Sequence, residues 1–184
     1  MDAFATVDEL RTYLGDPDLD DARAQLLLDV VSDEIRSALG WHITEQKDVT
    51  VVVDGSGDEK LLLPTRYLTA VSSVREDHRE LSGDDYLVYR TGYLTRVVSG
   101  FPIDWTCRPQ GVTVTFDHGY ADGAVPGAFR AVTLETVGRA WDNPAGGLKS
   151  RTVGRVALTY ADARAAVGPI DDPRLDVYRL PEGF

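Results

Sequence analysis

The first forty residues carry apolar positions that repeat with the period of an α-helix. Thr6 stands three residues before Glu9, which is the spacing of a capping box, and a short helix is expected from there to about Leu14, before Gly15. Asp20 can cap a second helix that ends before Gly40. Its apolar positions follow the i, i+3, i+4, i+7 spacing of an amphipathic helix: Ala24, Leu27, Leu28, Val31, Ile35, Ala38 and Leu39.

Between residues 43 and 120 the pattern changes to short β-type runs. These runs are rich in Val, Thr, Tyr and Leu, and turn residues separate them: 49–53, 60–63, 68–74, 86–89, 93–97 and 112–116. In the last run Val112, Val114 and Phe116 alternate with two threonines, which is typical of a strand with one buried face. A small antiparallel sheet or sandwich, inserted between helices, is expected here.

A third helix is predicted at about 126–142, because Pro126 fits a first helical turn. Its apolar side chains cover an arc of roughly 200°, whereas an ordinary surface helix has a stripe little wider than about 100°. The helix is therefore expected to pack on two sides, either as a central helix of its own chain or partly against another subunit. Glu135 and Arg139 have the i, i+4 order that favours an ion pair on the polar side.

Residues 150–160 predict a strand with Gly154 at a bend, and residues 161–184 contain three prolines, which favours an extended tail. The predicted fold class is therefore α+β. It has four parts: N-terminal helices at 1–42, an inserted antiparallel β block at 43–120, a core helix and C-terminal strand at 121–160, and the tail at 161–184.

Composition narrows the class of protein. A chain of 184 residues that is 43% hydrophobic can form a core without cross-links, and the single cysteine excludes an internal disulfide. The N-terminal residues do not have the pattern of a signal peptide. The net charge is −11, with ten acids and three arginines in residues 1–40. Such a chain is poorly suited to gripping nucleic acid and would suit a surface past which DNA slides, although a solubilising acidic face is the simpler alternative.

The sequence contains no specific chemical motif. His42, His78 and His118 lie in separate segments, without the partners at helical spacing that a metal site needs. Asp117 and His118 are adjacent at a strand end and are expected to be structural. Cys107 has no nucleophile signature and is expected to be a packing thiol. No catalytic residue, cofactor or metal ligand is predicted.

The order of several short motifs is similar to that of the head-to-tail connector, or adaptor, proteins of long-tailed double-stranded DNA bacteriophages. In those sequences a T-x-x-x-G-Y strand end leads through V-P into a helix, which N-P-x-G and a V-G-x-x-x-x-T-Y strand follow. The residues that match are Thr115, Gly119, Tyr120, Val125, Pro126, Asn143, Pro144, Gly146, Val153, Gly154, Thr159 and Tyr160. The resemblance covers the first 40 residues and about 112–160.

This resemblance implies a structural virion protein of the neck, assembled in the host cytoplasm, with no cofactor and no membrane partner. Its partners would be other copies in a ring of about twelve, the portal protein above, and the next neck or tail-completion protein below. The ring would extend the channel through which DNA passes without specific binding. Two alternatives from other classes are a small hydrolase-like enzyme whose site is not visible in sequence and a β-rich binding module.

Two sets of residues are candidates for these contacts. The tail is expected to dock on the portal or a neighbouring copy, with residues 177–180 as an added edge strand, unless it folds back to close its own core. The candidate interface residues are Phe129, Leu134, Val137, Trp141, Leu175, Val177, Tyr178, Leu180 and Phe184. The candidate channel-lining acids are Asp16, Asp18, Asp20, Asp21, Asp58 and Glu59.

Overall fold

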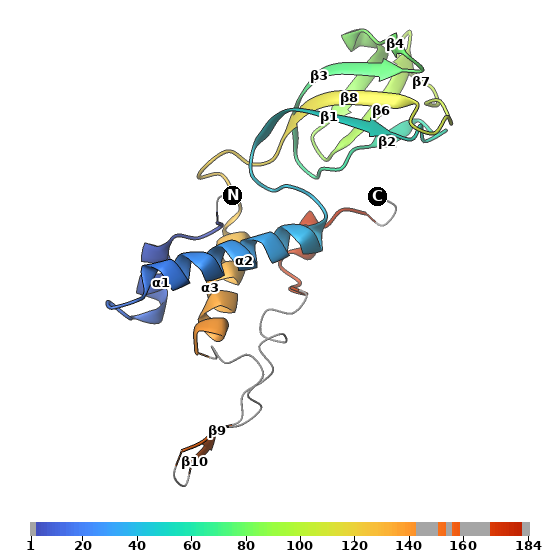
Figure 1. Ribbon diagram of the computed structural model, residues 1–184. Helices are drawn as coiled ribbons and strands as arrows, with labels where there is room; N and C mark the ends of the chain where they lie inside the picture. The colour runs from blue at the N-terminus through green and yellow to red at the C-terminus, as the bar shows by residue number, and fades with distance from the viewer. Residues whose placement is uncertain (1–2, 143–150, 154–155, 159–169, 182–184) are drawn as a thin grey trace. The chain divides into compact units, whose positions relative to one another are not determined.

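The computed structural model describes residues 3–142, 151–153, 156–158 and 170–181 (Figure 1). These residues confirm an α+β fold with three α-helices and antiparallel sheets. No helix in this part of the chain is long and apolar enough to cross a membrane.

The structure divides into two compact units. The helical unit lies within Met1–Leu39 and Val125–Val177, and the β unit lies within Gly40–Ala124 and Tyr178–Phe184. The predicted β block at 43–120 therefore falls in the β unit, and the predicted third helix falls in the helical unit. The four-part division itself stays a prediction.

Three helices make up the described core of the helical unit: α1 (Val7–Leu14), α2 (Asp21–Leu39) and α3 (Gly127–Asp142). The capping box of α1 forms as expected, because the Glu9 amide donates to Thr6 Oγ1 (3.2 Å) and the Thr6 amide donates to Glu9 Oε2 (2.9 Å). Gly15 ends α1 with φ 66°, a left-handed conformation that glycine adopts without strain.

Helix α3 packs against both α1 and α2, so its wide apolar arc is largely used within its own unit. The Phe129 ring lies 5.2 Å from that of Phe4, centroid to centroid. A Cβ at Gly138 would come within 3.0 Å of the Tyr13 ring, which shows how closely α1 and α3 approach. The predicted Glu135–Arg139 ion pair is wrong. The Glu135 carboxylate instead accepts two hydrogen bonds from Arg174, at 2.9 and 2.7 Å. Arg174 lies outside α3, so the helical period of α3 could not indicate this contact.

The β unit contains two antiparallel sheets (Figure 1). The first has the spatial order β1 (Gln46–Val53), β8 (Val112–His118), β3 (Leu68–Glu76) and β4 (Arg79–Glu80). The second has the order β2 (Lys60–Leu62), β6 (Tyr93–Val98) and β5 (Tyr86–Tyr89), and β7 (Phe101–Pro102) pairs with β6.

One hydrophobic core serves both sheets. Val112, Val114 and Phe116 are fully buried, as their alternation in β8 predicts, and they pack with Leu61 of β2 and Leu94 of β6. The edge strand β1 has a bulge before Val49, where Asp48 takes φ 53° and its amide donates to Asp117 Oδ1 (2.8 Å). This bulge interrupts regular pairing at the edge of the first sheet.

The C-terminal segments differ from expectation in two details. The stretch expected to be one strand contains two, β9 (Arg151–Val153) and β10 (Val156–Leu158), which pair antiparallel. The strand expected at 177–180 is wrong, because Asp176–Tyr178 forms a short 3-10 helix, η2. The Leu175 amide donates to the Asp172 carbonyl (2.9 Å), so the chain is already turning before η2 begins.

Candidate functional surfaces

The side chains that most often carry chemistry have structural surroundings in the described residues. His118, at the end of β8, is 5% exposed and packs beside Trp41, and burial lowers its pKa, with a smaller contribution from His42. Asp117 next to it accepts the Asp48 amide and is therefore used in the strand pairing. Cys107 is exposed, so the expectation of a packing thiol is wrong. Its neighbour Trp105 is buried, and Cys107 lies in the surface loop that leads to β8.

Three or more His, Cys, Asp or Glu side chains that could hold a metal ion do not come together anywhere in the described residues.

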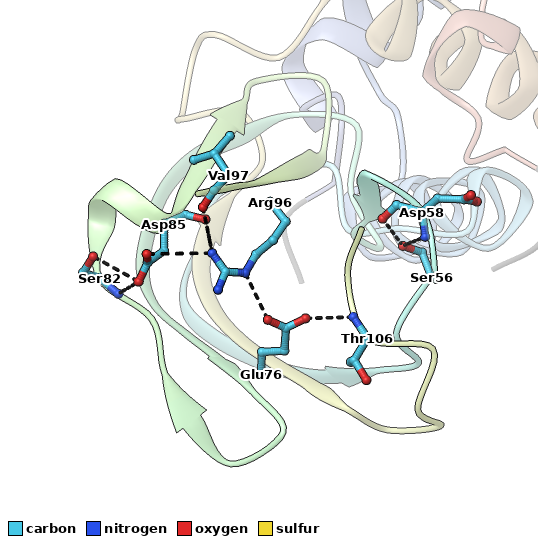
Figure 2. Close-up of polar contacts among 8 residues, drawn as sticks. All are labelled: Ser56, Asp58, Glu76, Ser82, Asp85, Arg96, Val97 and Thr106. Atoms are coloured by element: carbon cyan, nitrogen blue, oxygen red, sulfur yellow. Dashed lines mark hydrogen bonds and ion pairs between the residues drawn. The ribbon is translucent and has the colours of Figure 1, made fainter. Parts of the chain in front are cut away.

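A buried polar network holds the loops at one end of the β unit (Figure 2). Arg96 Nε donates to Glu76 Oε2 (3.0 Å), and Arg96 Nη1 donates to the carbonyls of Asp85 (2.6 Å) and Val97 (2.9 Å). Glu76 Oε1 accepts the Thr106 amide at 2.8 Å. The Arg96 and Glu76 side chains are 8% and 16% exposed, so this ion pair is shielded from water and fixes the loop that contains Thr106.

Two segments of the β unit, within residues 75–78 and 108–113, line a pocket of about 240 Å³. The Asp77 amide donates to the Gly111 carbonyl (2.9 Å), and the Gln110 amide donates to Asp54 Oδ1 (2.7 Å), so residues distant in sequence are held together. Arg75 and Arg108 line this pocket with His78 and Asp77. The sequence did not predict this site, because the contributing residues come from two separate segments and neither segment has a motif.

The four candidate interface residues of α3 have different environments. Phe129 and Val137 are 0% exposed, so they pack within the single chain and are not accessible to a neighbour there. Leu134 and Trp141 are partly exposed, and the Arg23 guanidinium lies 4.0 Å from the Trp141 ring centre. The contact of α3 with another subunit stays a prediction, and in the described conformation it involves Leu134 and Trp141.

The described part of the tail folds back on its own chain. Leu175 is 1% exposed, and the Tyr178 carbonyl accepts a bond from Trp41 Nε1 at 2.6 Å. Leu180 packs over Gly40. Val177 is 68% exposed, so it is the most accessible of the candidate tail residues, whereas Phe184 lies outside the described residues. The docking of the tail on a partner stays a prediction.

Several of the candidate acids already have a structural use. Asp20 Oδ1 accepts the Arg23 amide (3.1 Å) at the start of α2, Asp21 binds Arg11, and Asp16 Oδ1 accepts the Asp18 amide (3.1 Å).

The Asp18, Asp58 and Glu59 side chains are exposed. The exposure of these acids fits a solvated surface, and their place in a channel stays a prediction.

The β unit also exposes apolar side chains that are not among the candidate interface residues. In β5 the exposed fractions of Leu87, Val88 and Tyr89 are 48%, 47% and 37%, and Phe101 of β7 is 73% exposed. The run Tyr86–Tyr89 has no charged residue, which could have indicated an exposed apolar surface. Edge strands usually carry charged residues that discourage pairing with other strands.

Comparison with known proteins places this arrangement in a family. The family model described as "Head completion protein" matches residues 3–142, which include elements of both units. The chain belongs to the head completion protein family. No curated protein shows significant similarity to it.

The fold of this head completion protein is similar to that of chains in solved structures. A chain from "Neck of native GTA particle computed with C12 symmetry" is 13% identical, with a TM-score of 0.51, and the match covers 88% of this chain and 85% of that chain. A chain from "Neck of empty GTA particle computed with C6 symmetry" is 14% identical, with a TM-score of 0.50, covering 89% and 87%. At these identities the likeness establishes the fold alone.

Proposed function

We propose that this head completion protein is a structural component of the neck of a phage or phage-like particle, where its copies form a ring below the portal. The family match over residues 3–142 carries the proposal, because it covers both units. The likeness to chains of two neck structures solved with C12 and C6 symmetry supports a ring. A structural rather than an enzymatic role is consistent with the family match.

In this role the ring extends the DNA channel from the portal and offers a platform for the next neck or tail-completion protein. It is located in the virion and assembles in the host cytoplasm. The net charge of −11 supports passage of DNA without binding, because a surface that releases DNA has to avoid clustered phosphate contacts.

Electron microscopy of particles made without this chain tests the proposal. We expect DNA-containing heads without tails, and we expect the wild-type chain to restore tails. In a map of the restored neck, adjacent copies should bury on the order of 1,000 Å² or more per contact in a closed ring. Tailed particles of normal yield in the absence of the chain would refute the proposal.

A matched complementation experiment tests the structural role. His118→Ala and Asp117→Ala variants that fold should restore tails, because neither side chain is assigned a chemical step. Loss of tail attachment in a variant of unchanged melting temperature, together with a turnover that the wild type has and the variant lacks, would favour the enzyme alternative.

A further inference from the structure

The pocket at the turn end of the β unit has hydrogen-bond donors to which the described residues give no acceptor. Arg75 Nη2 donates to the His78 carbonyl at 3.3 Å, and Arg108 Nη1 lies 3.8 Å from Asp77 Oδ1, beyond hydrogen-bond length. A guanidinium has five N–H groups, so the described residues satisfy only a small part of the donor capacity of this pair. Two planar guanidinium groups facing one pocket match the geometry of a carboxylate.

A complementary group lies on the other unit of the same chain. Residues 12–22, which include the end of α1, the turn after it and the start of α2, contain four acids and no basic residue. Asp16 and Asp20 accept backbone amides, whereas the described residues provide no hydrogen bond or ion pair to the exposed Asp18 carboxylate. Asp18 is therefore the acid of this turn that is available to a second molecule.

We propose that Asp18 of one copy enters the Arg75–Arg108 pocket of the next copy around the ring. This inference rests on the ring of the proposed function. A closed ring is built from head-to-tail contacts, in which one patch of a subunit meets a different patch of its neighbour. The helical unit and the β unit supply such a pair of patches with opposite charge.

The structure favours a carboxylate over the phosphates of DNA as the occupant. Asp77 lines the same pocket, its side chain is 45% exposed, and its negative charge opposes a row of phosphates. The net charge of −11 adds a repulsion of the whole duplex, whereas a single aspartate on a neighbouring turn meets only the local field of the two arginines.

Cross-linking through the natural cysteine tests the contact directly. Cys107 is the sole cysteine, it is exposed, and it precedes Arg108 in the chain. Pro17→Cys places a second thiol next to Asp18 and keeps the carboxylate. With a short bismaleimide we expect a ladder of linked subunits from assembled rings. Asp84→Cys, an exposed control in the β unit, should give no such ladder. Absence of the ladder from intact rings of Pro17→Cys would overturn the inference.

A charge swap provides the second test. Arg108→Glu or Asp18→Arg should each weaken association of the full chain about tenfold or more in sedimentation velocity, and the double variant should recover to within about threefold of wild type. Lys47→Glu has the same change of charge at an exposed site of β1 and should have little effect.

The outcomes separate the inference from the function on which it rests. No recovery in the double variant, with rings still present in the neck, overturns the inference alone. Binding of a short DNA duplex that wild type retains and Arg108→Glu loses would identify a phosphate site and also overturn it. A neck map without a ring of this chain overturns the proposed function itself.

Discussion

The ion pair between Glu76 and Arg96 should stabilise the loop that carries Arg108, and the change Glu76→Gln tests this. Glu76 accepts two hydrogen bonds, from Arg96 Nε at 3.0 Å and from the Thr106 amide at 2.8 Å. A glutamine of the same shape keeps one carbonyl oxygen, so one donor keeps its partner and the other meets an amide NH2. The substitution also removes the charge next to Arg96.

The magnitude follows from these contacts. A hydrogen bond to a charged group contributes roughly 1.5–3 kcal/mol, and breaking a buried ion pair costs about 3–5 kcal/mol. In the variant, Arg96 keeps its hydrogen bonds to the carbonyls of Asp85 and Val97, and Glu76 is 16% exposed in the wild type. The cost should therefore lie between the value for one such hydrogen bond and the lower limit for a buried ion pair. We expect a loss of about 2–3 kcal/mol, which corresponds to roughly 30- to 150-fold faster opening of the Thr106 amide.

Amide hydrogen exchange measured by NMR is the appropriate assay, because the Thr106 amide itself donates to Glu76. Glu80→Gln is a matched control: Glu80 is exposed in β4, so its replacement should change stability by less than about 0.5 kcal/mol. If Thr106 exchanges less than about threefold faster in Glu76→Gln, the pair contributes almost nothing and the reasoning fails.

Three further predictions, with four substitutions, test the packing of the two units. Gly119→Ala should lower the free energy of unfolding in urea by about 2 kcal/mol or more, because Gly119 has φ 90° and a Cβ would lie 2.3 Å from the Thr44 carbonyl oxygen; an unchanged midpoint would contradict this. The pKa of His118 is lowered by burial, so the unfolded state binds its proton first, and stability should fall as pH drops below about 6.5. His118→Gln should flatten that dependence in thermal unfolding, and an unchanged slope would contradict it. Leu175→Ala should cost about 2–4 kcal/mol and Val177→Ala less than about 0.5, because their exposed fractions are 1% and 68%; equal costs in urea unfolding would show that the tail is not part of the core.

Local signals in the sequence predicted most of the fold. The capping box at Thr6 and the glycine that follows Leu14 depend only on neighbouring residues, and they fixed α1 to its observed bounds. The alternation in 112–116 predicted the buried face of β8, because a strand repeats every two residues whatever its partner is. The short strands β4 and β7 were missed, since two residues contain no detectable period.

The errors occurred where a distant residue decides the outcome. Glu135 has Arg139 in helical register, but it binds Arg174, which belongs to a turn more than thirty residues away. In a strand, residues 177 and 179 would face one side and residues 178 and 180 the other, but the turn around Asp172 bends the chain first. Pattern within one segment cannot reveal a partner from another segment, and the Arg75–Arg108 pocket was missed for the same reason.

The acidic character of residues 1–40 shows why a count of charges does not define a function. Ten acids in that region suggest a uniformly repelling surface, but capping and pairing use several of them within the chain. An acid that accepts a backbone amide or binds an arginine is already partly neutralised, and it contributes less to the field that DNA or a neighbour meets. In the proposed ring, the carboxylates to which the described residues give no such partner, Asp18 among them, would contribute most to the repulsion of DNA and to the choice of a neighbour. If Asp18 is occupied by the next copy, the channel loses one of its predicted acids, so the same measurements that test the contact also limit how negative the channel can be.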